Sequence, residues 1–411
     1  MSLPLLDISL NFSSGATFGN PFILGTSTIG GSDVLSNSSE APLIIDLTNS
    51  TRAISIKRGR NINRDTYEAG VCTVRIFDPN GDFNPQNVSS PYYGYLTPLR
   101  KLRISATYSG ETYYLFSGYT TDYIYVYDKA ENVSYVDIKA SDAFRLFAMA
   151  TITSVTGQAA GQDTGTRINK ILDTVEFPTS LRTVGTGNTL TQADPATTRT
   201  PLSAIKNVET CEQGAFYMSP EGNAVFKNRY DTIYSAAAIP TQFNQTGGIP
   251  YKNLIFAFDD KLIVNESSVT RVGGTTQTYI DVDSVAQYFP HAVNFSDLVV
   301  ETDQDSASIA AIYVATRSDT TIRIDQMTVD LYDPLVPSDI MLDLDYFDNV
   351  NISNIQPNGT VITKNLQIQG INWEISPNSW IGNFTTLEPI TDGFIIGNST
   401  YGVIGEDILS Y

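Results

Sequence analysis

Most of the chain alternates apolar and polar residues with a period of two, the pattern of a sheet that buries one face. In residues 101–108, Leu102, Ile104 and Ala106 fall on one side, while charged and hydroxyl side chains fall on the other. Six such runs lie at 52–58, 71–77, 101–108, 112–118, 122–127 and 133–140. Their close spacing predicts a closed or nearly closed antiparallel barrel within a first domain, residues 1–145.

A helical pattern replaces the alternation in residues 146–250. Apolar residues recur at helical spacing in 166–175, and Thr200-Pro201 supplies an N-cap and a proline at the first position of a second helix. Gly214 is predicted to end that helix. Two short strands follow at 215–219 and 224–229, joined by a turn. We therefore expect a small helix–hairpin domain of the α+β type.

Strands return in residues 251–411, together with one further helix that begins at the polar run 303–306. The predicted strands are 253–258, 261–265, 278–283, 321–325, 327–332, 350–355, 360–370 and 382–388, with a turn at Pro377-Asn378. The predicted fold class is mainly β with an α+β insertion. Two antiparallel β-barrel domains, 1–145 and the acidic 251–411, flank the helix–hairpin domain 146–250.

Charge is distributed unevenly along the chain. The net charge is −19, and residues 251–411 alone carry 22 acidic against 6 basic side chains. Residues 1–250 are close to neutral and include a basic stretch, Arg52, Lys57, Arg58, Arg60 and Arg64. The stretch is interpreted either as a solvated face or as part of a body whose two regions meet different partners. The acidic excess argues against specific nucleic-acid binding through phosphate neutralisation.

The side chains that carry enzyme or metal chemistry are scarce. The chain has one histidine, His291, and neither a G-x-S-x-G motif nor a phosphate-binding glycine loop. Cys72 and Cys211 are expected to be free, buried thiols, and two cysteines alone do not make a zinc site. We therefore expect no enzymatic activity, no cofactor and no metal. No apolar run reaches the roughly 18 residues of a membrane span, so stable membrane insertion is not expected.

Segment 78–84 carries oxygen-bearing side chains at alternate positions, as calcium loops do, but it lacks the later bidentate glutamate. Because Asn80-Gly81 directly follows a strand, a tight turn is the favoured interpretation.

Tyr123, Tyr125 and Tyr127 fall on one face of a single predicted strand. Such a face suits a carbohydrate platform or a protein interface, since tyrosine supplies rigid amphipathic area. Packing of the three rings against their own barrel is an equal alternative.

Several motifs together resemble a known family. They lie at 54–60, 67–70, 73–76, 78–87, 90–94 and 98–100, with further similar segments at 202–229, 283–288, 304–331 and 370–373. These residues resemble the minor tail proteins of siphophages, a group related to the tail hub proteins of long-tailed phages. Trp373 stands where members of the family often have histidine.

The resemblance implies a structural hub at the tail tip or baseplate of the virion. It implies a homotrimer whose two barrels per chain form a ring that continues the tail tube, contacting the distal tail protein, the tape-measure protein and the central tail fibre or spike. DNA would pass through the lumen during ejection. We expect the acidity of 251–411 to line that lumen. The basic stretch would then lie away from it, at a contact between subunits or with a partner.

The expected interface residues are Arg52, Lys57, Arg58, Arg60, Arg64, Tyr123, Tyr125 and Tyr127. Two other functions remain open: a receptor- or glycan-binding tail protein, which the tyrosine face would serve, and a cell-wall hydrolase.

Overall fold

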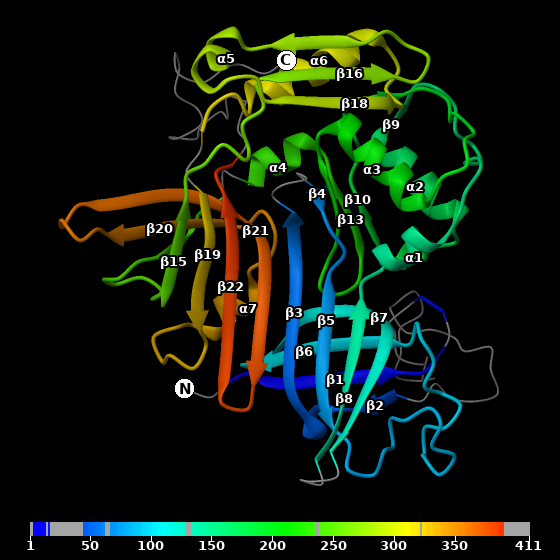
Figure 1. Cartoon of the computed structure of the whole chain (residues 1–411), viewed down its shortest axis with the longest axis vertical. Coiled ribbons are helices and arrows are strands. Elements are labelled where there is room, and N and C mark those ends of the chain that lie inside the picture. Colours follow the sequence, from blue (N-terminus) through cyan, green and yellow to red (C-terminus); the bar gives the residue numbers. More distant parts are fainter. Residues whose placement is uncertain are drawn as a thin grey trace.

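One long, mainly antiparallel sheet runs through both ends of the chain (Figure 1). The computed structural model describes residues 3–13, 15–16, 44–61, 66–128, 133–235, 238–320 and 323–389. Along the pairing path the strands are β15 (Asn253–Ala257), β19 (Arg323–Asp330), β22 (Ser379–Leu387), β21 (Val361–Ser376), β3 (Thr51–Asn61), β5 (Val71–Phe77), β8 (Val133–Ser141), β7 (Glu111–Asp128), β6 (Lys101–Tyr108), β1 (Leu5–Asn11) and β2 (Ile44–Asp46).

Shorter strands branch from this path. β4 (Thr66–Tyr67) pairs with β3, and β20 (Asn349–Ile355) pairs with β21 and with β14 (Thr241–Phe243). The 3-10 turn η1 (Thr48–Ser50) connects β2 to β3, and α7 (Ser338–Asp343) precedes β20. The mainly β prediction is confirmed. Among the described strands, however, the pairings form an open path, so no closed barrel is seen.

The two ends of the chain meet where β3 pairs with β21. The register runs from Ile54 opposite Ile375 to Gly59 opposite Gly370, and Figure 1 shows the orange and red C-terminal strands beside blue β3. Gly59 has φ +154°, and a Cβ there would lie 2.7 Å from the Cα of Gly370. The backbones therefore approach closely enough that glycine is required at this point of the β3–β21 pairing, which is the seam between the two ends of the chain.

The α+β part sits beside one end of the long sheet. It contains α1 (Phe144–Met149), α2 (Thr164–Thr174), α3 (Pro201–Glu212), α4 (Arg229–Ser235), η3 (Thr179–Leu181), the pair β9 (Gln162–Asp163) and β11 (Leu190–Thr191), and the sheet β10 (Arg182–Val184), β13 (Ala224–Lys227) and β12 (Ala215–Met218). Asp163 caps α2 and Thr200 caps α3 through their side chains. The predicted helices and hairpin are confirmed, although the residue that terminates α3 is Gln213, in a left-handed conformation, and not Gly214.

A third, smaller sheet packs on the α+β part (Figure 1, top). Its strands are β17 (Gln277–Ile280), β16 (Glu266–Arg271) and β18 (Ala292–Leu298), accompanied by α5 (Val282–Tyr288) and α6 (Asp303–Ala315). Thr302 and Asp305 form a capping box at the start of α6. The predicted strand 261–265 is wrong: these residues form a turn and a loop. The strand predicted at 278–283 ends at Ile280, because Asp281 caps α5.

Two buried apolar clusters hold these parts together. The first lies under the long sheet and includes residues from both ends of the chain, such as Ile56, Ile104, Met327, Trp373 and Phe384. The second lies among the helices and reaches the small sheet, with Phe144, Phe216, Ile205, Val269 and Ile309. Residues 251–389 thus contribute to both cores, which couples the C-terminal part to the rest of the chain.

Both cysteines are free and buried, as predicted. Burial raises the pKa of the Cys72 thiol far above its ordinary range, and that of Cys211 to about 12. Since the thiolate is the reactive form, we expect neither cysteine to react with an aromatic disulfide reagent at pH 8 until denaturant unfolds the chain. Counting labelled thiols by mass checks this, and rapid labelling of either one in the native protein would contradict it.

Candidate functional site

The outer face of the long sheet is mainly polar, with a few exposed apolar side chains such as Val71 and Ile124. Ile54 and Ile56 of β3 point to the core, whereas Ser55 and Lys57 between them point outward. The register places outward residues in rows that cross both halves of the chain. One row is Asn253, Thr328, Asn383, Asn372, Lys57 and Val71, and a second is Asp330, Ile381, Glu374, Ser55, Thr73, Lys139 and Asp122.

Side chains on this face bond mainly to one another. The Asn383 side-chain oxygen accepts hydrogen bonds from Gln326 (2.8 Å) and Thr328 (2.7 Å). Ser55 donates to Glu374 across the seam at 2.7 Å. In the described residues, no group of three or more His, Cys, Asp or Glu side chains is arranged to hold a metal ion. The arrangement suits a surface in contact with water or with another protein.

Charges of both signs share the outer face. Arg75 makes two hydrogen bonds to Asp137, at 2.7 and 2.9 Å. Lys57 stands beside Asn372, one row from Glu374. On the described part of this face, Lys57 of the basic stretch therefore lies close to Glu374 of the C-terminal part.

The four residues of the basic stretch that the structure describes do not form one patch. Arg52 is exposed and lies 5.5 Å from the ring centre of Phe77. Lys57 is on the outer face, Arg58 is buried, and Arg60 lines a cleft. Arg64 lies outside the described residues.

Arg58 ties three parts of the chain together. Its side chain is 7% exposed, forms an ion pair with Asp345 at 3.2 Å, and donates to the Met218 carbonyl at 3.1 Å. The guanidinium also lies 4.8 Å from the ring centre of Tyr346. Burial alone would lower the pKa of Arg58, but Asp345 and neighbouring groups hold it above its ordinary value. Burial raises the pKa of Asp345, and Arg58 opposes that rise. Arg58 thus connects β3 to β12 and to the segment before β20, and we expect these contacts to stabilise the packing of the three segments.

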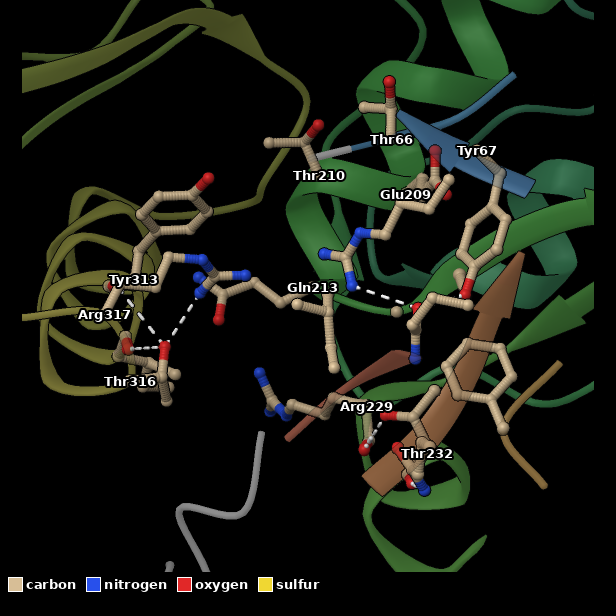
Figure 2. Close-up of a pocket in the computed structure, with 18 of the residues that line it drawn as sticks. Thr66, Tyr67, Glu209, Thr210, Gln213, Arg229, Thr232, Tyr313, Thr316 and Arg317 are labelled. Atoms are coloured by element: carbon tan, nitrogen blue, oxygen red, sulfur yellow. Dashed lines mark hydrogen bonds between the residues drawn. The ribbon is translucent and has the colours of Figure 1, made fainter. Parts of the chain in front are cut away.

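The half-buried cleft in Figure 2 lies where the long sheet, the α+β part and the small sheet meet, and has a volume of about 160 Å³. Arg60, Arg229 and Arg317 line it, together with Tyr67 and Gln213. Figure 2 shows the side chains of Arg229 and Arg317 pointing into the same space. Sequence reasoning missed Arg229 and Arg317, because only the fold brings these residues near Arg60.

The tyrosine face packs largely on its own sheet. Tyr123 and Tyr125 are half-buried against the first core. Tyr125 and Tyr127 stack with ring centres 6.3 Å apart, and Tyr127 is 48% exposed. Tyr123 and Tyr125 therefore pack on their own sheet, whereas the Tyr127 ring is exposed.

The segment 78–84 forms a turn, as predicted. The Asp78 carboxylate accepts the backbone N–H groups of Asp82 (2.8 Å) and Phe83 (3.0 Å), and Gly81 has φ +69°. The acidic side chain thus stabilises the turn from within.

None of the helices in the described ranges combines the length and the apolar character required to cross a membrane.

No known family model matches the chain, and no curated protein matches it in sequence. Solved structures do share its fold. A tail protein from Neisseria meningitidis MC58 superposes with a TM-score of 0.56 at 9% identity, over 94% of this chain and 97% of that one. The 43 kDa tail protein of prophage MuSo2 from Shewanella oneidensis gives a TM-score of 0.51 at 14% identity, over 85% and 96%. The likeness shows a common fold along nearly the whole length.

Proposed function

We propose that the chain is a structural subunit of a long-tailed bacteriophage tail, built into the hub ring at the tail tip or baseplate. The observation that carries the proposal is the fold, which extends over nearly the full length of two tail proteins. The sequence motifs at 54–100 point the same way. The hub acts through its surfaces, without catalysis or a cofactor.

The edges of the long sheet support assembly into a larger structure. β15 and β2 end the pairing path, so each has one edge without a partner among the described strands. Ile255 and Phe256 of β15 are 44% and 38% exposed. Open, apolar strand edges are prone to pair or pack with another chain. In the proposed homotrimer, these edges lie at contacts between subunits or with the distal tail protein.

The outer face of the sheet supports the proposed lumen. Its rows contain many Asn, Thr and Ser side chains, Arg75 on this face is paired with Asp137, and the net charge is −19, all of which disfavour tight binding of DNA phosphates. In this arrangement Lys57 of the basic stretch lies on the lumen face, which differs from the expectation that the stretch lies away from it. A lumen of this kind would let DNA pass during ejection. The tape-measure protein and the central fibre or spike are the proposed neighbours along the ring axis.

The expected result for the purified chain is a trimer. Its mass by light scattering should be three times that of the 44.9 kDa chain, and micrographs should show a ring. Micrographs of phage particles labelled for this protein should place it at the tail tip. A monodisperse monomer that forms no ring would count against the proposal.

A charged edge should disrupt the trimer. In the double variant Ile255→Lys/Phe256→Lys, both changes fall at exposed positions of β15. We therefore expect dissociation to monomers with little loss of monomer stability, because charges on an edge strand oppose association. Val361→Lys is a control, since Val361 is 59% exposed but lies on β21. Light scattering should distinguish the variants, and a trimer unaffected by the β15 changes would exclude this edge from the interface.

A further inference from the structure

One side of the short helix α5 exposes apolar residues. Val282 begins this helix, Ala286 follows one turn later, and Phe289 comes directly after its last residue. Val282 is 72% exposed and Phe289 80%, and Ile280 at the end of β17 is 46% exposed. Figure 1 shows α5 beside the small sheet, at the end of the molecule opposite β1 and β2. We refer to Ile280, Val282, Ala286 and Phe289 as the α5 surface. Apolar side chains that gather on an exposed surface mark interaction sites.

Phe289 has a backbone conformation that suits glycine. Its φ is +66° and its ψ is 169°, a combination that residues with a side chain rarely adopt. The buried Asn265 fixes this conformation, because its amide nitrogen donates to the Phe289 carbonyl at 2.8 Å and its amide oxygen accepts the His291 N–H at 2.7 Å. Burial of the Phe289 ring within the chain does not offset the strain. Strained residues of this kind cluster at binding sites, where a partner supplies the missing contacts.

The surroundings of the α5 surface are acidic. Residues 264–320 contain 8 Asp and Glu residues against 2 Arg and no Lys. Glu266 of β16 lies directly opposite Ile280 of β17, Asp281 caps α5, and Asp283 lies in the first turn of α5. Acidic side chains therefore stand beside the apolar ones.

The two arginines of residues 264–320 interact with other groups. Arg271 bonds to Asp303 at 2.6 Å, and the Arg317 guanidinium lies 3.9 Å from the ring centre of Tyr313. Within the described part of the chain, the acidic side chains of the preceding paragraph form no ion pair. Their charge is available to a partner that carries the opposite charge.

We propose that the α5 surface binds a basic amphipathic segment of a partner protein. The apolar side chains of that segment cover Val282 and Phe289, and its Lys or Arg side chains pair with Glu266, Asp281 and Asp283. The acidic residues disfavour other occupants, because they repel nucleic-acid and lipid phosphates and a second copy of a chain whose net charge is −19. Since the α5 surface lies outside the long sheet, the proposal holds or fails independently of the hub ring.

Titration of the full chain with a synthetic peptide tests the proposal. The probe is a peptide of leucine and lysine at helical spacing, and the same peptide with glutamate in place of lysine is its control. The lysine peptide should bind and the glutamate peptide should not. Val282→Ser should weaken binding of the lysine peptide by about tenfold, because serine supplies no apolar contact.

Val88→Ser is the matched control variant. Val88 is 74% exposed but lies in the loop between β5 and β6, so its replacement should leave the affinity unchanged. Equal affinities in the Val282 and Val88 variants would overturn the proposal, since binding would then reflect only the attraction of a basic peptide to an acidic protein. Failure of the lysine peptide to bind the unmodified chain would overturn it as well.

Phe289→Gly separates binding from folding. Glycine adopts the backbone conformation of residue 289 without strain, so the variant should unfold at a temperature no lower than the unmodified chain. Binding of the lysine peptide should nevertheless weaken by about tenfold, because the ring is lost. A lower unfolding midpoint would show that the ring stabilises the chain itself, which contradicts a role in binding a partner.

Two further measurements test the other occupants. Val282→Ser should leave the mass of the assembled chain by light scattering unchanged, and the unmodified chain should not bind vesicles of phosphatidylglycerol. Loss of the trimer in this variant would assign the α5 surface to a contact between copies. Vesicle binding that Val282→Ser abolishes would assign the surface to a membrane. Either result would exclude a basic protein segment as the occupant.

Discussion

Replacing Arg58 with methionine should lower the free energy of unfolding by about 3 kcal/mol. The change leaves Asp345 without its ion-pair partner, removes the bond to the Met218 carbonyl, and ends the contact with Tyr346. Breaking a buried pair by removing one partner costs about 3–5 kcal/mol. We expect the lower end of that range, because the Asp345 side chain is 29% exposed and can gain water.

Urea unfolding of the variant and of a matched control measures this cost. Arg75→Met breaks an ion pair in which the arginine side chain is 47% exposed, so it should cost less than about 1 kcal/mol. Adding Asp345→Leu to Arg58→Met should recover part of the loss, since no uncompensated charge then remains. If Arg58→Met lowers the free energy of unfolding no more than Arg75→Met does, the contacts of Arg58 do not stabilise the fold as proposed.

The local elements could be predicted because their signals are local. Strands β5 and β6 have the predicted bounds, since apolar residues recur at every second position in both; burial follows this alternation throughout β5, whereas in β6 Lys101 and Ser105 are buried as well. Helix α3 begins after the predicted cap Thr200, whereas α2 begins at Thr164, two residues before the predicted start, after the cap Asp163. The predicted strands 112–118 and 122–127 are instead one strand, β7, which continues through a register shift between Thr120 and Asp122.

The site was harder to predict because its contacts join distant residues. Lys57 lies opposite Asn372 only because β3 pairs with β21. The sequence of neither strand indicates which strand it pairs with. The inward position of Arg58 did carry a signal. The alternation that buries Ile54 and Ile56 also turns residue 58 toward the core. The burial of Arg58 thus follows from the period of two in residues 54–58, and the basic charge of the stretch carries no information about it.

The seam provides the last prediction: Gly59→Ala should destabilise the chain by about 3 kcal/mol or more. A non-glycine residue in such a backbone conformation costs about 1–3 kcal/mol, and overpacking adds a similar amount. A Cβ at Gly59 would lie 2.7 Å from the Gly370 Cα and 3.1 Å from the Gln369 carbonyl oxygen, so the opposing backbone itself has to move.

Gly94→Ala separates the two causes. Gly94 also has a positive φ, +84°, but nothing lies within 4 Å of its added Cβ. It should therefore show the conformational cost alone, at the low end of about 1–3 kcal/mol. Unfolding midpoints measure the difference, and equal losses in the two variants would mean that the seam is not tightly packed.

The pairing of β3 with β21 joins the two ends of the chain. In Gly59→Ala, hydrogen exchange should therefore become faster in β3 and β21, with a smaller change in β6 and β7. Uniform acceleration across all four strands would show that the two halves unfold as one unit even with a weakened seam.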